Sequence, residues 1–172
     1  MKILYLLRHA KSSWAEPGLG DQQRSLNKRG SSDAPMMGER FAGRGEQLDH
    51  IVSSPALRAL STAELFAEAC GLAGDQIDTN SDLYFLGSGS IEATILAQDD
   101  QVERLMLVFH NPDITEFVNS IDYAFHVDNM PTCGLVKLSC DIESWSNWSR
   151  DNTRFDYFDF PKNDSGAVLG AS

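Results

Sequence analysis

The chain has few cysteines, and this shortage excludes two kinds of stabilised site. Only Cys70, Cys133 and Cys140 occur among 172 residues, an odd number without paired spacing. Such a set does not build a disulfide framework and predicts free thiols in a reducing compartment. Because Cys and His residues do not cluster in the sequence, we also predict no zinc site.

Long apolar runs are missing as well. Met1 and Lys2 are followed by only five apolar residues before Arg8, too few for the hydrophobic region of a signal peptide. No segment approaches the roughly 20 apolar residues that cross a bilayer as a helix. We therefore expect a cytosolic protein without a membrane partner.

Positive charge is scarce: 14 Lys and Arg residues stand against 25 Asp and Glu residues, a formal net charge of -11. An acidic surface repels polyanions, which argues against a nucleic-acid partner. It also repels free anionic substrates at long range, so a cationic site in this chain has to act locally.

Length and pattern predict one folded unit. With 42% hydrophobic residues, the chain can build a single core. We expect one domain over residues 1–162 and a small, polar, disordered tail over residues 163–172. Predicted strands and helices alternate, which indicates the α/β class: a three-layer α/β/α sandwich with a mostly parallel central sheet.

Several connections are also predicted. Residues 11–23 contain Pro and Gly and read as a loop over the site, and Asn27 is a candidate cap for the next helix. Pro35 predicts that this helix is kinked or begins later, near Asp33. Residues 87–90 predict a plain turn, and residues 152–160 a final edge strand.

The first informative junction lies near the N-terminus. Residues 3–7 are continuously apolar, as in a strand buried on both faces of a parallel sheet, and Arg8 and His9 follow at once. Ligands of open α/β sheets bind beyond the carboxyl ends of the strands, so we expect this pair to face a crevice. Taken alone, the pair could equally be the polar residues with which any strand leaves a core.

The second junction repeats the pattern. Residues 104–109 form another apolar run, which ends in His110. Asn111 and Pro112 follow as a candidate helix cap and first helical residue, so His110 should lie between a strand end and a helix N-terminus. The alternative for His110 is a core histidine bonded to the backbone.

The third junction carries an arginine. Residues 51–53 close a short strand, Ser54 is a candidate cap, Pro55 a candidate first helical residue, and Arg58 lies one turn into the helix. By itself, Arg58 could be an ordinary solvated helix residue.

Together these groups suit phosphoryl transfer. A neutral imidazole can accept a phosphoryl group covalently, and guanidinium groups bind phosphate bidentately. Helix N-termini add backbone N–H donors for an anion. Because the transition state is loose, catalysis depends mainly on positioning and charge, and two His and two Arg side chains could supply both without a metal or another cofactor.

Three ordered motifs resemble one family. Residues 6–10 (Leu-Leu-Arg-His-Ala) resemble the Arg-His-Gly/Ala signature of the histidine phosphatase superfamily, which has the phosphoglycerate mutase-like fold. Residues 53–59 with 62–64 resemble its second motif, and residues 108–112 its third. The small size and residues 8–14 and 26–30 are similar to the SixA-type phosphohistidine phosphatase branch. The resemblance runs from about Lys2 to Leu138.

The resemblance implies a role for each of the four side chains. His9 would be the phosphorylated nucleophile, Arg8 and Arg58 phosphate clamps, and His110 a phosphate-binding, charge-stabilising partner. The implied substrate is a phosphohistidine protein, such as a phosphorelay domain. A small phosphorylated metabolite is the alternative, and a phosphate-binding module without turnover on the same fold is a third reading.

One departure from the family bears on the substrate. Larger members use a carboxylate as general acid, and here Glu92, Asp82 and Asp113 are only weak candidates that read more simply as solvated or capping residues. An alkoxide leaves poorly without a proton, whereas an imidazole, with an unperturbed pKa of ~6.5, departs readily. The missing acid therefore favours cleavage of the P–N bond of phosphohistidine.

Overall fold

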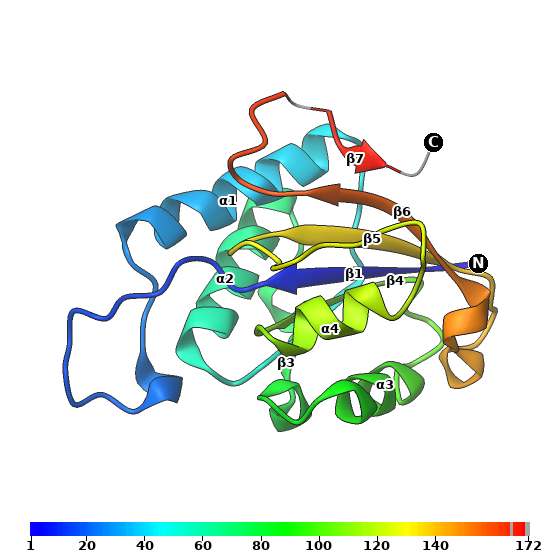
Figure 1. Cartoon of the computed structure of the whole chain (residues 1–172), viewed down its shortest axis with the longest axis horizontal. Helices are drawn as coiled ribbons and strands as arrows, with labels where there is room; N and C mark the ends of the chain where they lie inside the picture. The colour runs from blue at the N-terminus through cyan, green and yellow to red at the C-terminus, as the bar shows by residue number, and fades with distance from the viewer. Residues whose placement is uncertain (166, 171–172) are drawn as a thin grey trace.

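The computed structural model describes residues 1–165 and 167–170 and contains one sheet with the strand order β3-β2-β4-β1-β5-β6-β7 (Figure 1). The elements in chain order are β1 Lys2–Arg8, α1 Lys28–Gly43, β2 His50–Ser53, α2 Leu57–Cys70, β3 Ile77–Thr79, α3 Ser88–Leu96, β4 Arg104–Phe109, α4 Asp113–Asn119, β5 Leu135–Cys140, β6 Thr153–Asp159 and β7 Leu169–Gly170.

The sheet has two halves that meet at β1. Strands β3, β2, β4 and β1 are parallel, whereas β5, β6 and β7 continue the sheet with antiparallel pairings. The α/β class is confirmed, but the expected mostly parallel sheet is wrong for the second half. The reason is the connection: β5, β6 and β7 follow one another without a helical crossover, which parallel neighbours require.

The helices cover both faces of the sheet, so the predicted three layers are present (Figure 1). Alternate residues of β1 point to opposite faces, as in any strand. Leu4 and Leu6 pack with buried residues of α3 and α4, whereas Tyr5 and Leu7 pack with buried residues of α1 and α2. The central strand is therefore apolar on both sides, as residues 3–7 predicted.

Two helix starts differ from expectation. The Asn27 side chain accepts a hydrogen bond from the Gly30 N–H and caps α1, which begins at Lys28 and contains Pro35, so the later start near Asp33 is wrong. Helix α2 begins at Leu57 with Ala56 as its cap, and Ser54 and Pro55 precede it. Arg58 is therefore the second residue of α2 rather than one turn in.

Short elements account for the other differences. β3 has three residues and was not predicted, because so short a segment carries no clear alternation. α3 begins at Ser88, inside the segment predicted as a turn. α4 begins at Asp113 with Pro112 as its cap, so Asn111 is not the cap residue.

The C-terminal segment has partners in its described part. β7 pairs with Tyr157 and Phe158, so β6 is not the edge strand. Asn163 is buried and donates to the Asp159 carboxylate and the Ala167 carbonyl. Within the expected disordered tail, residues 163–165 and 167–170 are described, with the short strand β7 and local hydrogen bonds of Asn163. Residues 166 and 171–172 lie outside the described residues.

Two sequence features have a plain structural counterpart. Cys70, Cys133 and Cys140 are free thiols, and the last two are buried. Among the described residues, every helix is too short or too polar to traverse a lipid bilayer.

One glycine lets α1 approach the segment that follows β1. A Cβ on Gly30 would lie 2.1 Å from the Lys11 carbonyl oxygen, a distance that no side chain can adopt. The same carbonyl accepts a hydrogen bond from the Asn27 N–H. The start of α1 is thereby fixed to the chain two residues beyond His9.

We predict that Gly30→Ala lowers the free energy of unfolding by about 1–3 kcal/mol, the usual cost of overpacking. The matched control is Gly43→Ala, at the other end of α1, where a Cβ meets no atom within 4 Å. There alanine should be neutral or raise stability, because Gly costs roughly 0.5–1 kcal/mol relative to Ala in a helix. Urea unfolding checks both, and equal stability of the two variants would contradict the close approach.

Candidate active site

The parallel register of β1 and β4 places His9 beside His110. Arg8 pairs with Phe109 at the ends of these strands, and the His9 N–H donates to the Phe109 carbonyl at 3.1 Å. The next residue on each strand is a histidine, and the two ring centroids lie 5.2 Å apart. Two junctions about 100 residues apart in sequence thus form one site.

The end of β2 adds Ser54 to this pair. Ser54 N–H donates to the Val108 carbonyl, and Ser54 Oγ lies 2.7 Å from His110 Nε2. Since this oxygen also accepts the Ala56 N–H, its own proton is free to point at Nε2. In that arrangement His110 carries its proton on Nδ1, a buried atom with no hydrogen-bond partner among the described residues.

His9 is held in one tautomer. Its Nδ1 lies 2.7 Å from the Ala10 carbonyl oxygen, which can only accept, so Nδ1 carries the proton and Nε2 the lone pair. The Ala10 N–H donates to Thr62 Oγ1, and the Thr62 hydroxyl donates to the Arg58 carbonyl. Thr62, on α2, therefore links the backbone beside His9 to the helix that carries Arg58.

Two guanidinium groups lie close to the imidazoles. Arg58 is 2% exposed, and Arg8 is half-buried with one Nη atom donating to the Met130 carbonyl at 2.6 Å. Arg8 Nε is buried without a partner in the described part of the chain. Burial and then the positive charge of Arg58 lower the pKa of Arg8. Two like charges held out of water favour an anion between them.

An aspartate that sequence reasoning missed contacts Arg58. Residues 11–27 fold back so that a short helix at Asp21–Gln23 meets α2. Arg58 Nη2 lies 2.8 Å from the Asp21 carboxylate, and Nη1 donates to the Asp21 carbonyl at 2.7 Å. Although partial burial raises the pKa of Asp21, hydrogen bonds from Tyr84, Arg58 and Arg24 hold it well below its usual range. Asp21 is therefore ionised at neutral pH.

Two aromatic residues complete the surroundings of His110. The Tyr84 hydroxyl donates to the Asp21 carboxylate at 2.6 Å, and this bond raises the pKa of Tyr84. The Phe85 ring stacks on His110, with centroids 4.7 Å apart and 25° between the planes. Neither residue lies in a recognisable motif, and only the folded chain brings them to the site.

The weak candidates for a general acid have other partners. Glu92 pairs with Arg150 at 2.5 Å, and Asp113 accepts the Gly87 N–H at 3.1 Å. Asp82 is half-buried, and its backbone N–H donates to the side-chain oxygen of the cap residue Asn80. These contacts match the solvated or capping reading of the three carboxylates.

Burial keeps both histidines neutral. Loss of water lowers the pKa of His9 to about 3, and the charges of Arg58, Arg8 and Arg24 add to this against the opposing bond to the Ala10 carbonyl. Burial, followed by His9 and Arg58, likewise lowers the pKa of His110 to about 3. At pH 7 the centre therefore consists of two neutral imidazoles, two guanidinium groups and one carboxylate at its edge.

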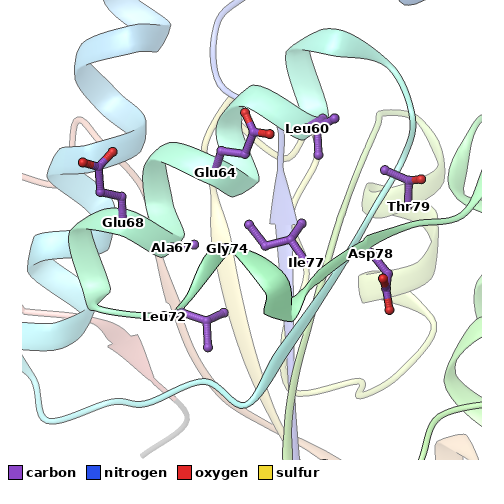
Figure 2. Close-up of a pocket in the computed structure, with 9 residues that line it drawn as sticks. All are labelled: Leu60, Glu64, Ala67, Glu68, Leu72, Gly74, Ile77, Asp78 and Thr79. Atoms are coloured by element: carbon purple, nitrogen blue, oxygen red, sulfur yellow. The ribbon is translucent and has the colours of Figure 1, made fainter.

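A separate groove lies between α2 and β3 (Figure 2). Its lining includes Leu60 and Ile77, but also the carboxylates of Glu64, Glu68 and Asp78. It shares no lining residue with the cluster around His9, and its negative charge disfavours a phosphate ligand. The strand ends are therefore the better candidate for an oxyanion site than this groove.

Comparison with known sequences identifies the class of protein. The sequence profile of the histidine phosphatase superfamily (branch 1) matches residues 4–111, which include Arg8, His9, Arg58 and His110. The chain belongs to this superfamily, as the resemblance of the three motifs implied.

Individual relatives are similar over different lengths. A crystal structure of the putative phosphohistidine phosphatase SixA from Agrobacterium tumefaciens has 31% identity and a TM-score of 0.78, covering 93% of this chain and 98% of that one. The protein histidine phosphatase SixA complexed with tungstate has 20% identity and a TM-score of 0.78, covering 94% and 98%, which shows the fold alone. The probable phosphoglycerate mutase GpmB of Salmonella arizonae is 37% identical over 94 residues, which are 54% of this chain and only 41% of that relative.

The depressed histidine pKa values give a direct test. With a pKa of about 3, His9 stays neutral as the pH falls from 8 to 5 and takes up a proton only well below its usual value of ~6.5. We predict that the ring resonances of His9 and His110 do not titrate over this range in NMR spectra. An inflection near pH 6.5 assigned to His9 would contradict the neutral, buried site.

Proposed function

We propose that this protein is a phosphatase that removes a phosphoryl group through a phosphohistidine intermediate on His9. We further propose a phosphohistidine protein of the cytosol, such as a phosphorelay domain, as its substrate. The observation that carries this proposal is the bond between His9 Nδ1 and the Ala10 carbonyl, which leaves the Nε2 lone pair free near the charges of Arg58 and Arg8.

In the first step, the Nε2 lone pair of His9 attacks the phosphorus, and the bond from phosphorus to the substrate nitrogen breaks. The second ring nitrogen of the substrate takes a proton from water, so a neutral histidine departs, and the hydroxide left behind is neutralised by the proton that the attacking water releases in the second step. His9 keeps its proton on Nδ1 and becomes a positively charged phosphoimidazole, which the Ala10 carbonyl stabilises.

In the second step, water attacks the phosphorus of phospho-His9 and releases inorganic phosphate and neutral His9. In both steps Arg8, Arg58 and the Nδ1–H of His110 stabilise the charge on the equatorial oxygens. Two guanidinium groups supply the compensating positive charge and the neutral His110 donates a hydrogen bond, so the proposed steps use no metal ion.

The state of Asp21 favours phosphohistidine over an ester. It is the carboxylate that contacts Arg58, and its lowered pKa leaves it without a proton to donate. An alkoxide leaving group requires such a proton, whereas the imidazole of phosphohistidine needs far less help. The proposal therefore does not include a general acid.

A small phosphorylated metabolite is the second candidate substrate. It is favoured by the similarity to a probable phosphoglycerate mutase, although the match covers less than half of that relative. The third reading, a phosphate-binding module without turnover, differs from both in forming no adduct on His9.

The decisive experiment offers phosphohistidine, sugar phosphate and phosphoserine substrates side by side to the protein and to His9→Ala. We predict the highest kcat/KM on phosphohistidine, no turnover by the variant, and an acid-labile, base-stable phosphoryl label on His9 after brief mixing. Equal or better activity on sugar phosphates would indicate that the substrate is a small metabolite and not phosphohistidine. A label on serine or cysteine would refute the mechanism. Binding of substrate without any label or turnover would favour the third reading, a phosphate-binding module.

Removing the Arg58 clamp should act mainly on the transition state. We predict that Arg58→Ala lowers kcat/KM by about 10²–10³-fold, the usual effect of losing one preorganised donor. Arg58→Lys should restore only part of this, because an ammonium group cannot make the planar bidentate contact. Arg29→Lys, an exposed arginine of α1 paired with Asp33, is the control. Unchanged kinetics of Arg58→Lys would return Arg58 to an ordinary helix residue.

The Asp21 carboxylate should compete with the phosphoryl group for Arg58. We predict that Asp21→Asn binds inorganic phosphate about fivefold more tightly, because a repulsion of ~1 kcal/mol between two anions near the same cation disappears. Glu16→Gln removes an equal charge from an exposed position in the same loop and should leave binding unchanged. Calorimetry measures both constants. Weaker binding by Asp21→Asn would mean that the carboxylate mainly orients Arg58.

A further inference from the structure

Phe85 adopts a backbone conformation that a bulky residue rarely holds. It has a φ of 56°, in the left-handed region, and stands between a short helix at Ser81–Leu83 and α3. For a residue with a large side chain this conformation is strained, and such strain persists only where surrounding contacts enforce it. The position of this ring is therefore specified by the fold.

Contacts on both sides hold the loop of Phe85 in place. The preceding residue, Tyr84, donates its hydroxyl to Asp21, which also binds Arg58. Two residues further on, the Gly87 N–H donates to the carboxylate of Asp113, the first residue of α4. The loop is thus connected at one end to the arginine cluster and at the other to the helix that follows His110.

The ring of Phe85 is placed between the site and solvent. It stacks on His110 at 4.7 Å, and His110 in turn lies 5.2 Å from His9. Phe85 nevertheless remains 43% exposed, although Phe, like other large apolar residues, is usually buried. Part of the ring is therefore available to a molecule that enters the site from solvent.

We propose that Phe85 is a specificity-determining residue, whose exposed ring packs against a planar aromatic leaving group while the phosphoryl group lies between His9 and the arginines. The inference rests on the proposed function, since it concerns the group to which the phosphoryl is attached. An imidazole offers such a planar face, whereas the alkyl carbon of phosphoserine or of a sugar phosphate does not.

The physical gain comes from contact between the two rings. Offset or edge-to-face aromatic pairs are favourable beyond the area they bury, and a ring held in place by strain and hydrogen bonds loses little entropy on contact. Phe85 would thus discriminate aromatic from alkyl leaving groups without an added charge.

Binding of two phosphonates tests the contact without turnover, since neither has a bond that the enzyme hydrolyses. We expect the protein to bind phenylphosphonate about fivefold more tightly than methylphosphonate. Phe85→Leu, which keeps an apolar side chain but removes the ring, should bring this ratio close to one while leaving the Kd for methylphosphonate within twofold. Phe85→Tyr should retain the preference.

A matched variant separates the ring from the loop. Leu86→Ala removes an exposed apolar side chain at the neighbouring position, which is 59% exposed, and should preserve the ratio of the two constants. Equal loss of both ligands in Phe85→Leu, or an unchanged ratio, would overturn the proposal. If Leu86→Ala loses the preference to the same degree, the loop as a whole and not the ring is responsible, which also overturns it.

Turnover then relates the contact to the reaction. Phosphohistidine and phosphoramidate both have a P–N bond, but only the first has an aromatic leaving group. In Phe85→Leu, kcat/KM should fall about fivefold for phosphohistidine and within twofold for phosphoramidate. Absence of a His9 adduct in the unmodified protein would refute the proposed function, whereas the phosphonate ratio refutes or supports the role of Phe85 independently.

Discussion

The site depends above all on the register of three parallel strands. β1 and β2 both pair with β4, so the residues that follow their last paired positions, His9, Ser54 and His110, emerge at one edge of the sheet. Side chains alternate between faces along a strand, so a slip of one residue in either pairing would turn one of these groups to the other face. Packing on both faces of β1 and β4 opposes such a slip, because it would exchange the side chains that fit the two buried clusters.

The same burial that fixes the register sets the protonation of the centre. Imidazoles removed from water beside guanidinium groups remain neutral, and burying a neutral His9 costs less free energy than burying a charged one. The two guanidinium groups keep their charge, and their charges are compensated by different partners. Arg58 is paired with the ionised Asp21, whereas Arg8 donates to the Met130 carbonyl. A phosphoryl group that enters the proposed site would thus approach Arg58, which is already paired with a carboxylate, and Arg8, whose partner is an uncharged carbonyl.

The sequence predicted what depends on local pattern. Apolar runs that end in polar residues identified β1 and β4, and with them His9 and His110 at the site. The direction of β5 and β6 does not follow from such runs, because a buried antiparallel strand and a parallel one have the same composition. Asp21 and Phe85 were out of reach for another reason: their loops have no periodicity, and their proximity to Arg58 and His110 arises only from chain folding. Composition also did not indicate that Asn163 donates hydrogen bonds to Asp159 and Ala167, each four residues away.

The antiparallel half of the sheet contains none of the four side chains proposed to act on phosphate, yet it supports them. The N–H of Cys133 contacts the carbonyls of Arg8 and His9, and the carbonyl of Gly134 accepts the Arg8 N–H. These contacts come from residues more than 120 positions further along the chain. During synthesis, Arg8, His9, Arg58 and His110 are therefore all added to the chain before Cys133 and Gly134, which contact the end of β1. The proposed site is therefore complete only when β5 pairs with β1, and a nascent chain that already contains its four side chains still lacks these contacts.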